Sequence, residues 1–167
     1  LISPKMIEIV ANGTYGTNDT ITIAAGTITT PGGVCVKKSV VIVGAGRDET
    51  TINMTNPDGF IGLSVCGGID EGDGTPQPLK ESITYVQKDM TINNGIGVVV
   101  PYMDDTDNVI TASLTYERIK ATNCIYCMYP LITLGRDESS AVVMVKDTVV
   151  VAGAESFSGG FVGVAKN

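Results

Sequence analysis

The chain has 167 residues, 43% of them hydrophobic, and its 11 Lys and Arg against 18 Asp and Glu give a formal net charge of −7. This length and composition predict a single folded domain over residues 1–167, and the acidic balance excludes a general nucleic-acid partner. The sequence contains no histidine, which excludes a Ser-His-Asp triad and His-ligated metal sites. No apolar run reaches the ~18 residues of a membrane span, so none is expected.

The N-terminal sequence gives two signals about processing. The chain begins at Leu1 and not at methionine, which indicates a processed mature protein or a trimmed one. Three N-x-[ST] sequons begin at Asn12, Asn18 and Asn53, and each is a candidate N-glycosylation site. Such triplets also arise by chance in a Thr-rich β protein. Together these signals predict an extracellular or cell-surface protein.

Strand signals dominate the chain, with frequent β-branched residues, 20 glycines and no sustained helical period. A first strand is expected at residues 6–10. Further on, "VVIVGAG" starts like a dinucleotide-binding loop, but Glu49 stands where the third glycine of that motif belongs. Residues 50–55 then read as a second strand followed by a turn at residues 56–59. Gly44 and Gly46 therefore predict a tight corner between two strands.

A short unit of one or two turn residues followed by an apolar strand recurs along the chain. It occurs at Gly32-Gly33-Val34, Asp58-Gly59-Phe60, Asn94-Gly95-Ile96, Asn123-Cys124-Ile125 and Gly159-Gly160-Phe161. In the middle of the chain, a steady offset of 29 residues aligns Tyr85 with Leu114 and Val143, Met90 with Ile119 and Thr148, and Ile92 with Ala121 and Val150. A period of this length, built of short strands, is typical of one turn of a parallel β-solenoid.

The repeat thus predicts an all-β fold, a right-handed parallel β-helix of about five or six coils. Asn94 and Asn123 suit its corners, because asparagine tolerates left-handed backbone and can form ladders between coils. The alternative is an antiparallel sandwich, for which Asn12-Gly13 and Asn94-Gly95 could supply hairpin turns. The aligned repeats favour the β-helix.

Three segments resemble the right-handed β-helix proteins of the pectin methylesterase and pectate lyase type. They are "KMIEIVANGTY", "VKKSVVIVGAGRDETTIN" and "DMTINNG", which look like that family's first coil, its glycine corner and its "n-x-T-I-x-N" strand. The resemblance covers residues 5–95 and implies a shared coil geometry. It also implies that Gly44 and Gly46 turn the chain between two faces of a β-helix.

The esterase's catalytic pattern does not carry over to this chain. Where that family has a Gln-Ala-Val-Ala strand, residues 96–100 read Ile-Gly-Val-Val-Val, and where it has a Gln-Asp pair before Leu-Tyr, residues 125–130 read Ile-Tyr-Cys-Met-Tyr-Pro. No catalytic residue can therefore be assigned, and pectin esterase or lyase activity is not expected.

Three acidic loops are the remaining candidates for a binding site. They carry Asp70, Glu71 and Asp73, then Asp104, Asp105 and Asp107, then Asp137 and Glu138. In a solenoid they are expected on the same side of successive coils, where stacked carboxylates attract a hard cation. A weak Ca²⁺ site is predicted at Asp70, Asp73, Asp104 and Asp107. Solvated loops without a ligand, or a carboxylate pair acting on a sugar, are the alternatives.

The four cysteines are Cys35, Cys66, Cys124 and Cys127. A single Cys-x-x-Cys without histidine or a following helix argues against zinc or thioredoxin-like chemistry, so buried thiols or two disulfides of undecided pairing are expected. For a polysaccharide partner, Tyr102, Tyr126 and Tyr129 are the plausible aromatic platforms, although tyrosine on strands more often packs.

The ends of the chain indicate a role in assembly for the predicted β-helix. It begins in a strand-like segment and stops at Asn167 after "GGFVGVA", with no sign of the caps that protect the ends of most solenoids. Head-to-tail stacking into an extracellular filament is therefore predicted, with the chain as its own partner. The expected junction consists of Ile7, Ile9, Val10, Phe161, Val162 and Val164. A carbohydrate-active or carbohydrate-binding β-helix, and a piece of an adhesin or phage tail fibre, are the alternatives.

Overall fold

The computed structural model describes residues 13–30, 34–55, 63–70, 72, 75–99, 101–128, 130–151 and 164–166. Over these residues the chain is all-β and contains no helix. Its strands are β1 (Asp19–Ile23), β2 (Gly26–Thr30), β3 (Val34–Val36), β4 (Val40–Gly44), β5 (Thr50–Met54), β6 (Leu63–Val65), β7 (Gly68–Ile69), β8 (Pro76–Gln77), β9 (Ile83–Val99), β10 (Tyr102–Asp104), β11 (Thr111–Met128), β12 (Leu131–Thr133), β13 (Ser140–Lys146), β14 (Val149–Val151) and β15 (Val164–Lys166).

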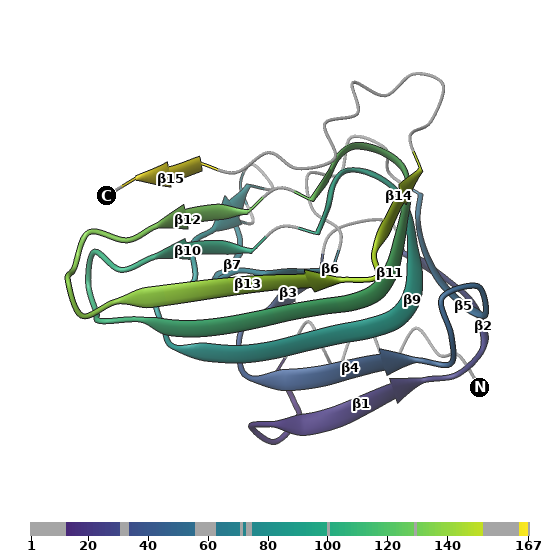
Figure 1. Ribbon diagram of the computed structural model, residues 1–167, viewed down its shortest axis with the longest axis horizontal. Coiled ribbons are helices and arrows are strands. Elements are labelled where there is room, and N and C mark those ends of the chain that lie inside the picture. Colours follow the sequence, from purple (N-terminus) through teal and green to yellow (C-terminus); the bar gives the residue numbers. More distant parts are fainter. Residues whose placement is uncertain are drawn as a thin grey trace.

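Parallel pairing dominates the structure. The main sheet has the order β1-β4-β9-β11-β13, and β2, β5 and β14 continue it around a bend. Two smaller parallel sheets, β3-β6 and β10-β12-β15, form the side of the stack opposite the main sheet. Figure 1 shows the main-sheet strands side by side in the order β1 to β13, with β10, β12 and β15 facing them. Each strand belongs to one repeat, and a repeat is also called a layer of the stack. Among the described strands only β7 and β8 pair antiparallel, which contradicts the antiparallel-sandwich alternative.

The chain passes through these sheets in five repeats, each a main-sheet passage followed by a short strand on the other side. The first four are β1–β3, β4–β6, β9–β10 and β11–β12, and the fifth is β13–β15. The 29-residue register is confirmed in the later repeats, where Leu114 pairs with both Tyr85 and Val143, Ile119 with Met90, and Ala121 with both Ile92 and Val150.

The early repeats follow a different spacing. Asp19 pairs with Val40 and Val40 with Tyr85, separations of 21 and 45 residues. The long separation includes the β7–β8 hairpin, in which Gly67 donates to Gln77 and Asp70 to Thr75 through their backbones. The chain returns at Leu79, which bridges in parallel to Met103. The hairpin is thus an insertion that leaves the stacking of the flanking repeats intact.

The core lies between the two sides and is built from columns of inward-facing side chains. One column runs through all five repeats as Ile28, Ile52, Ile92, Ala121 and Val150. The first four are buried and Val150 is half-buried. Because strands alternate faces, a register shift of one residue would expose this column, so burial fixes the pairing.

Left-handed residues mark two corners of the repeat. Asn94 and Asn123 have φ angles of 71° and 52°, as their turn positions predict. Asp89, Arg118 and Asp147 form a second set, with φ of 60°, 50° and 46°. Asparagine and aspartate accept this region more readily than other non-glycine residues.

Gly44, at the end of β4, lies close to the backbone of the next repeat. A Cβ added at Gly44 would lie 2.1 Å from the carbonyl oxygen of Asp89, so only glycine fits. Residues 45–49, here called the corner loop, then lead into β5, and no helix follows β4. The sequence prediction of a corner between two strands is confirmed.

Candidate functional sites

The acidic loop after β10 uses its carboxylates locally. Asp104 accepts from the Thr106 N–H at 2.7 Å and from the Thr106 hydroxyl, and these bonds hold its pKa below the usual range. Asp107 accepts from Lys80 Nζ at 2.5 Å. Both Asp104 and Asp107 therefore already have hydrogen-bonding partners.

Asp105, on the same loop, is buried and ties two repeats together. Its carboxylate accepts from the backbone N–H groups of Gly135 and Arg136 at 2.8 and 2.9 Å, while Arg136 Nε donates to the Asp105 carbonyl oxygen. Burial alone would raise the pKa of Asp105, but these backbone bonds outweigh it and the pKa is lowered. The loop of Asp137 and Glu138 therefore stacks on the loop of Asp105, as expected from the sequence.

The first acidic loop belongs to the β7–β8 insertion. Asp70 Oδ1 accepts from the Gly72 N–H at 2.7 Å, while Glu71 and Asp73 lie outside the described residues. Among the residues that the structure describes, no group of three His, Cys, Asp or Glu side chains is arranged to hold a metal ion. A calcium site involving Asp73 stays a prediction.

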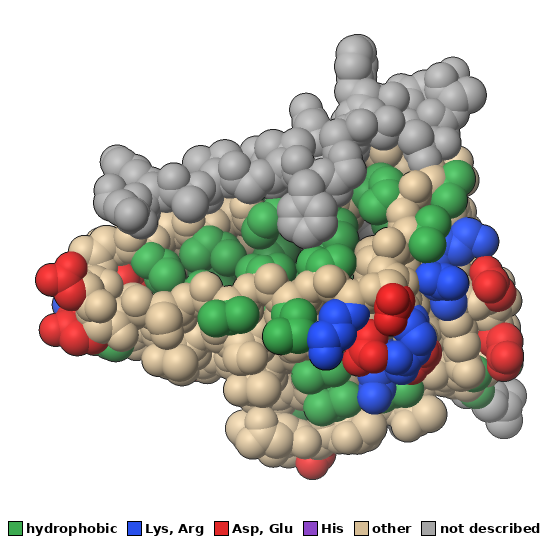
Figure 2. Space-filling view, viewed as in Figure 1, with side chains coloured by type: hydrophobic (Ala, Val, Ile, Leu, Met, Phe, Trp, Pro, Cys, Tyr) green, Lys and Arg blue, Asp and Glu red, His purple; other side chains and the backbone are tan. Residues whose placement is uncertain are grey.

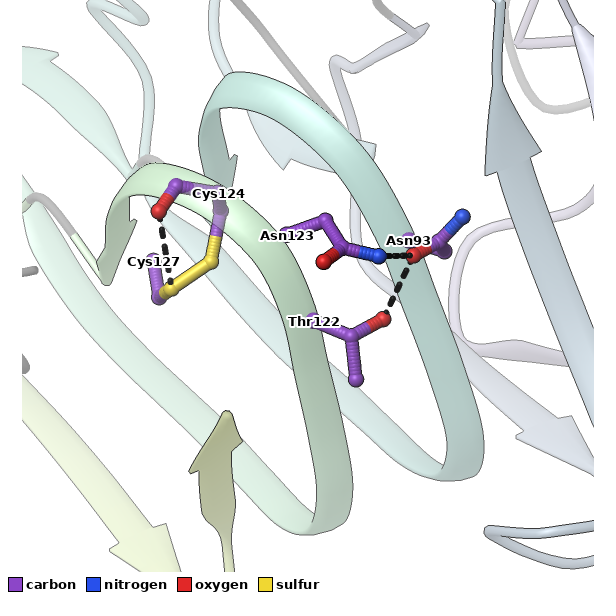
Figure 3. Close-up of a disulfide and its surroundings, with 5 residues drawn as sticks. All are labelled: Asn93, Thr122, Asn123, Cys124 and Cys127. Carbon is purple, nitrogen blue, oxygen red and sulfur yellow. Dashed lines mark hydrogen bonds between the residues drawn. A yellow bond between two sulfur atoms is a disulfide. The ribbon is translucent and has the colours of Figure 1, made fainter. Parts of the chain in front are cut away.

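The structure pairs all four cysteines. Cys35 and Cys66 join the first and second repeats with their Cα atoms 5.2 Å apart, and the half-buried Tyr102 packs against them. Cys124 and Cys127 close a short bridge within β11, as Figure 3 shows. Of the other two candidate sugar platforms, Tyr129 and the side chain of Tyr126 lie outside the described residues.

The three sequons differ in their surroundings. Asn18 is exposed on the turn before β1, with φ of 66°. Asn53 is half-buried on β5, and its side-chain oxygen accepts from Asn93 Nδ2 at 2.7 Å. Asn12 lies outside the described residues. Of the two described sequons, only Asn18 presents a solvent-exposed side chain.

Asn93 is the centre of a polar ladder along the stack. Besides donating to Asn53, it accepts from the Thr122 hydroxyl at 2.7 Å and from Asn123 Nδ2 at 2.8 Å (Figure 3). The sequence predicts a ladder at Asn94 and Asn123, and the central place of Asn93 was not predicted. The "INN" sequence at 92–94 contained the signal, since either asparagine could face the next layer.

Charged residues form two columns beside this ladder, and neither column was predicted from the sequence. Lys88 pairs with Glu117 and Glu117 with Lys146 in the register, and the next positions are Asp89, Arg118 and Asp147. Signs therefore alternate along each column and across each row. Figure 2 shows Lys, Arg, Asp and Glu side chains gathered on one part of the surface. The 29-residue offset alone would have revealed both columns.

The corner loop crosses this charged surface and contacts three later repeats. The Arg47 carbonyl oxygen accepts from the Thr91 hydroxyl, Asp48 accepts from Lys120 Nζ at 3.1 Å, and Arg47 Nη1 donates to the Asp147 carbonyl oxygen. The resemblance implied only a turn for this segment. Its contacts with later repeats depend on side chains that the motif does not specify.

The C-terminal repeat differs from the repeats before it. Its outward-facing residues Val142, Met144, Val149 and Val151 are exposed, whereas Ser113 and Thr115 occupy the positions of Val142 and Met144 one layer earlier. Figure 2 shows hydrophobic side chains along β13 and β14. The predicted junction residues Ile7, Ile9, Val10, Phe161 and Val162 lie outside the described residues, and Val164 is placed only as the first residue of β15.

Comparison of the chain with known protein families, curated proteins and solved structures finds no match. The resemblance to pectin methylesterases and pectate lyases therefore stays a prediction from sequence motifs. Within the described ranges, no helix has the length and apolar character needed to cross a membrane.

Proposed function

We propose that this chain is an extracellular structural protein, a right-handed parallel β-helix that self-associates through the ends of its stack of repeats. Filaments of stacked subunits are the assembly that the sequence predicts. Two disulfides support an extracellular location, because such bonds persist in oxidising compartments. The regular 29-residue register supports a β-helix, because each repeat offers the next the same template.

The observation that carries self-association is the surface of the C-terminal repeat. β13 stands at the edge of the main sheet, and its described neighbour is β11 alone. An edge strand with apolar side chains is a template for pairing with another chain, and proteins that avoid pairing place charges or proline there. Here the outward side chains of Val142 and Met144 are 58% and 42% exposed.

The carbohydrate-active alternative needs free carboxylates at a suitable spacing. Among the described residues of the best acidic loop, Asp104, Asp105 and Asp107 each bind a neighbouring group, which favours a structural role for them. A piece of an adhesin or tail fibre, the other alternative, would use the same edge for repeats of a longer chain.

Light scattering after size-exclusion chromatography, combined with electron microscopy over a hundredfold concentration range, tests the proposal. We expect species larger than one chain whose population grows with concentration by mass action. A single chain at every concentration would contradict self-association.

A further inference from the structure

The two ends of the stack differ in how well their core is covered. At the first repeat, the inward-facing Ile21 and Ile28 are buried, with 7% and 2% exposed. At the last repeat, the inward-facing residues of β13 and β14 are only half-buried, namely Ala141, Val143, Val145 and Val150. The apolar interior is therefore more open at the C-terminal end.

The outer face of the same repeat is apolar as well. Of the five exposed large hydrophobic residues in the described part of the chain, four lie in β13 and β14, and the fifth is Val109. A junction at this end must therefore cover side chains on both faces of β13.

We infer that two copies of this chain join C-terminal repeat to C-terminal repeat around a two-fold axis, with β13 antiparallel to β13 of the second copy. The inference rests on the proposed self-association and names its partner and geometry. The contact is isologous, so it closes after two subunits.

The β13 sequence "SAVVMVK" suits antiparallel pairing with itself about Val143. Inward, Ala141 would face Val145 of the second copy, so the apolar interior would continue across the junction. Outward, Val142 would face Met144 of the second copy, so each exposed side chain would gain an apolar partner. Directly opposed side chains lie about 4.5–5.5 Å apart at Cβ, close enough for contact.

Charge also fits this register. Ser140 would lie opposite Lys146 of the second copy, so neither lysine would meet a like charge directly across the junction. Like charges directly opposite each other would destabilise such a pair of strands, and this register avoids them.

Head-to-tail stacking fits the same residues less well. If the columns continue into β1 of another copy, Val143 would lie beside Asp19 and Met144 beside Thr20, following the printed register through β4, β9 and β11. The Asp19 carboxylate already accepts from the Gly16 N–H at 2.7 Å. Val145 would lie beside Ile21 and Val150 beside Ile28, but Val143 would face a carboxylate and the outward Met144 a hydroxyl.

A charge-insertion variant tests the interface. The double variant Val142→Lys with Met144→Lys places like charges opposite each other across the proposed junction. Both side chains are exposed, so circular dichroism and the melting temperature of the isolated chain should change little. We expect a dimer for the native chain and a monomer for the variant by light scattering. Val109→Lys, an equally exposed substitution away from β13, should remain a dimer.

Cross-linking tests the register itself. The Val142→Cys protein and the Met144→Cys protein, each oxidised alone, should form no intermolecular disulfide. In each dimer the new thiol lies opposite an unchanged residue, and the matching thiol of the second copy lies only diagonally across the junction. A mixture of the two should give a covalent dimer, since opposed Cβ atoms come within disulfide reach. No cross-link in the mixture, or a dimer that survives the double lysine variant, would overturn the inference.

The outcomes also separate this inference from the proposed function. Open filaments that are lost in the double lysine variant would overturn the two-fold dimer and keep self-association. A monomer at every concentration would overturn both.

Discussion

Arg118 forms two parallel hydrogen bonds with Asp89, which lies 29 residues earlier in the preceding repeat. Nε donates to Oδ1 at 2.5 Å and Nη2 donates to Oδ2 at 2.9 Å, and the guanidinium also contacts Glu117. The Asp89 side chain is 20% exposed. Two-bond pairs of arginine and carboxylate combine charge with fixed geometry, so this pair fixes the register of two layers.

Arg118→Ala should lower the free energy of unfolding only modestly, because the pair is partly exposed and screened by solvent. Urea unfolding measures the change. Lys120→Ala is the matched control, since it removes a looser pair in which the Asp48 side chain is 75% exposed. An equal loss in both variants would mean that the geometry of the Arg118 pair adds nothing.

The same pair predicts a pH dependence. The Arg118 hydrogen bonds lower the pKa of Asp89. A carboxyl group whose pKa is lowered by folding contributes stability above its unfolded pKa, about 4, and loses it as the pH falls through the folded value. The stability difference between native protein and Arg118→Ala should therefore be full at pH 7 and shrink below about pH 4. A difference that does not shrink at all as the pH falls below about 4 would contradict this origin.

Two tyrosines whose rings meet edge to face should respond in opposite ways to loss of the hydroxyl. Tyr85 and Tyr116 are both fully buried, with ring centroids 5.8 Å apart. The Tyr85 hydroxyl donates to Gln87 Oε1 at 2.8 Å, whereas the Tyr116 hydroxyl has no partner among the described residues. Tyr116→Phe should thus stabilise the protein by about 1 kcal/mol and Tyr85→Phe should destabilise it by a similar amount. Thermal unfolding of both variants gives the signs, and a loss in both would show that Tyr116 is satisfied in solution.

Asp147 tests the left-handed corner without disturbing the core. Its φ is 46°, and its described tertiary contact is made by its carbonyl oxygen, which accepts from Arg47. Asp147→Gly should keep or raise the stability, whereas Asp147→Val should lower it by about 1–2 kcal/mol, because a β-branched residue resists this region. Similar melting temperatures for the two variants would contradict a left-handed backbone at this position.

The two disulfides should differ in their contribution to stability. Cys35 and Cys66 are 31 residues apart, whereas Cys124 and Cys127 are 3 apart. Loop-closure entropy gives roughly 3.5 kcal/mol for the first bridge and about 2 kcal/mol for the second. Replacing each pair by alanine and comparing urea midpoints checks the order, and a larger loss from the Cys124–Cys127 pair would reverse it.

Much of the later stack could be predicted from the sequence. Tyr85, Leu114 and Val143 align because the third, fourth and fifth repeats keep one length, so a fixed offset places every residue. The first two repeats could not be aligned in this way. Their loops vary in length, and the β7–β8 insertion changes the count between Val40 and Tyr85.

The candidate sites were harder to predict than the fold. The sequence predicted a shared site for Asp70 and Asp104, and it did not reveal that Asp70 belongs to an insertion and accepts a hydrogen bond within its own hairpin. A cluster of acidic residues in a sequence does not reveal which carboxylates already accept hydrogen bonds in the folded protein. The contacts of the corner loop with Lys120 and Asp147 depend on the direction of a loop, which local sequence does not fix.

The distance between Thr22 and Lys146 tests the stacked register most directly. Register pairs connect them through Val43, Lys88 and Glu117, which makes four strand spacings. Spin labels on cysteines introduced at these two exposed positions, diluted with unlabelled protein, report that distance by pulsed electron resonance. At about 4.8 Å per spacing, backbone positions should lie about 19 Å apart, plus the length of the labels. A backbone separation beyond about 30 Å would contradict a single in-register stack from β1 to β13.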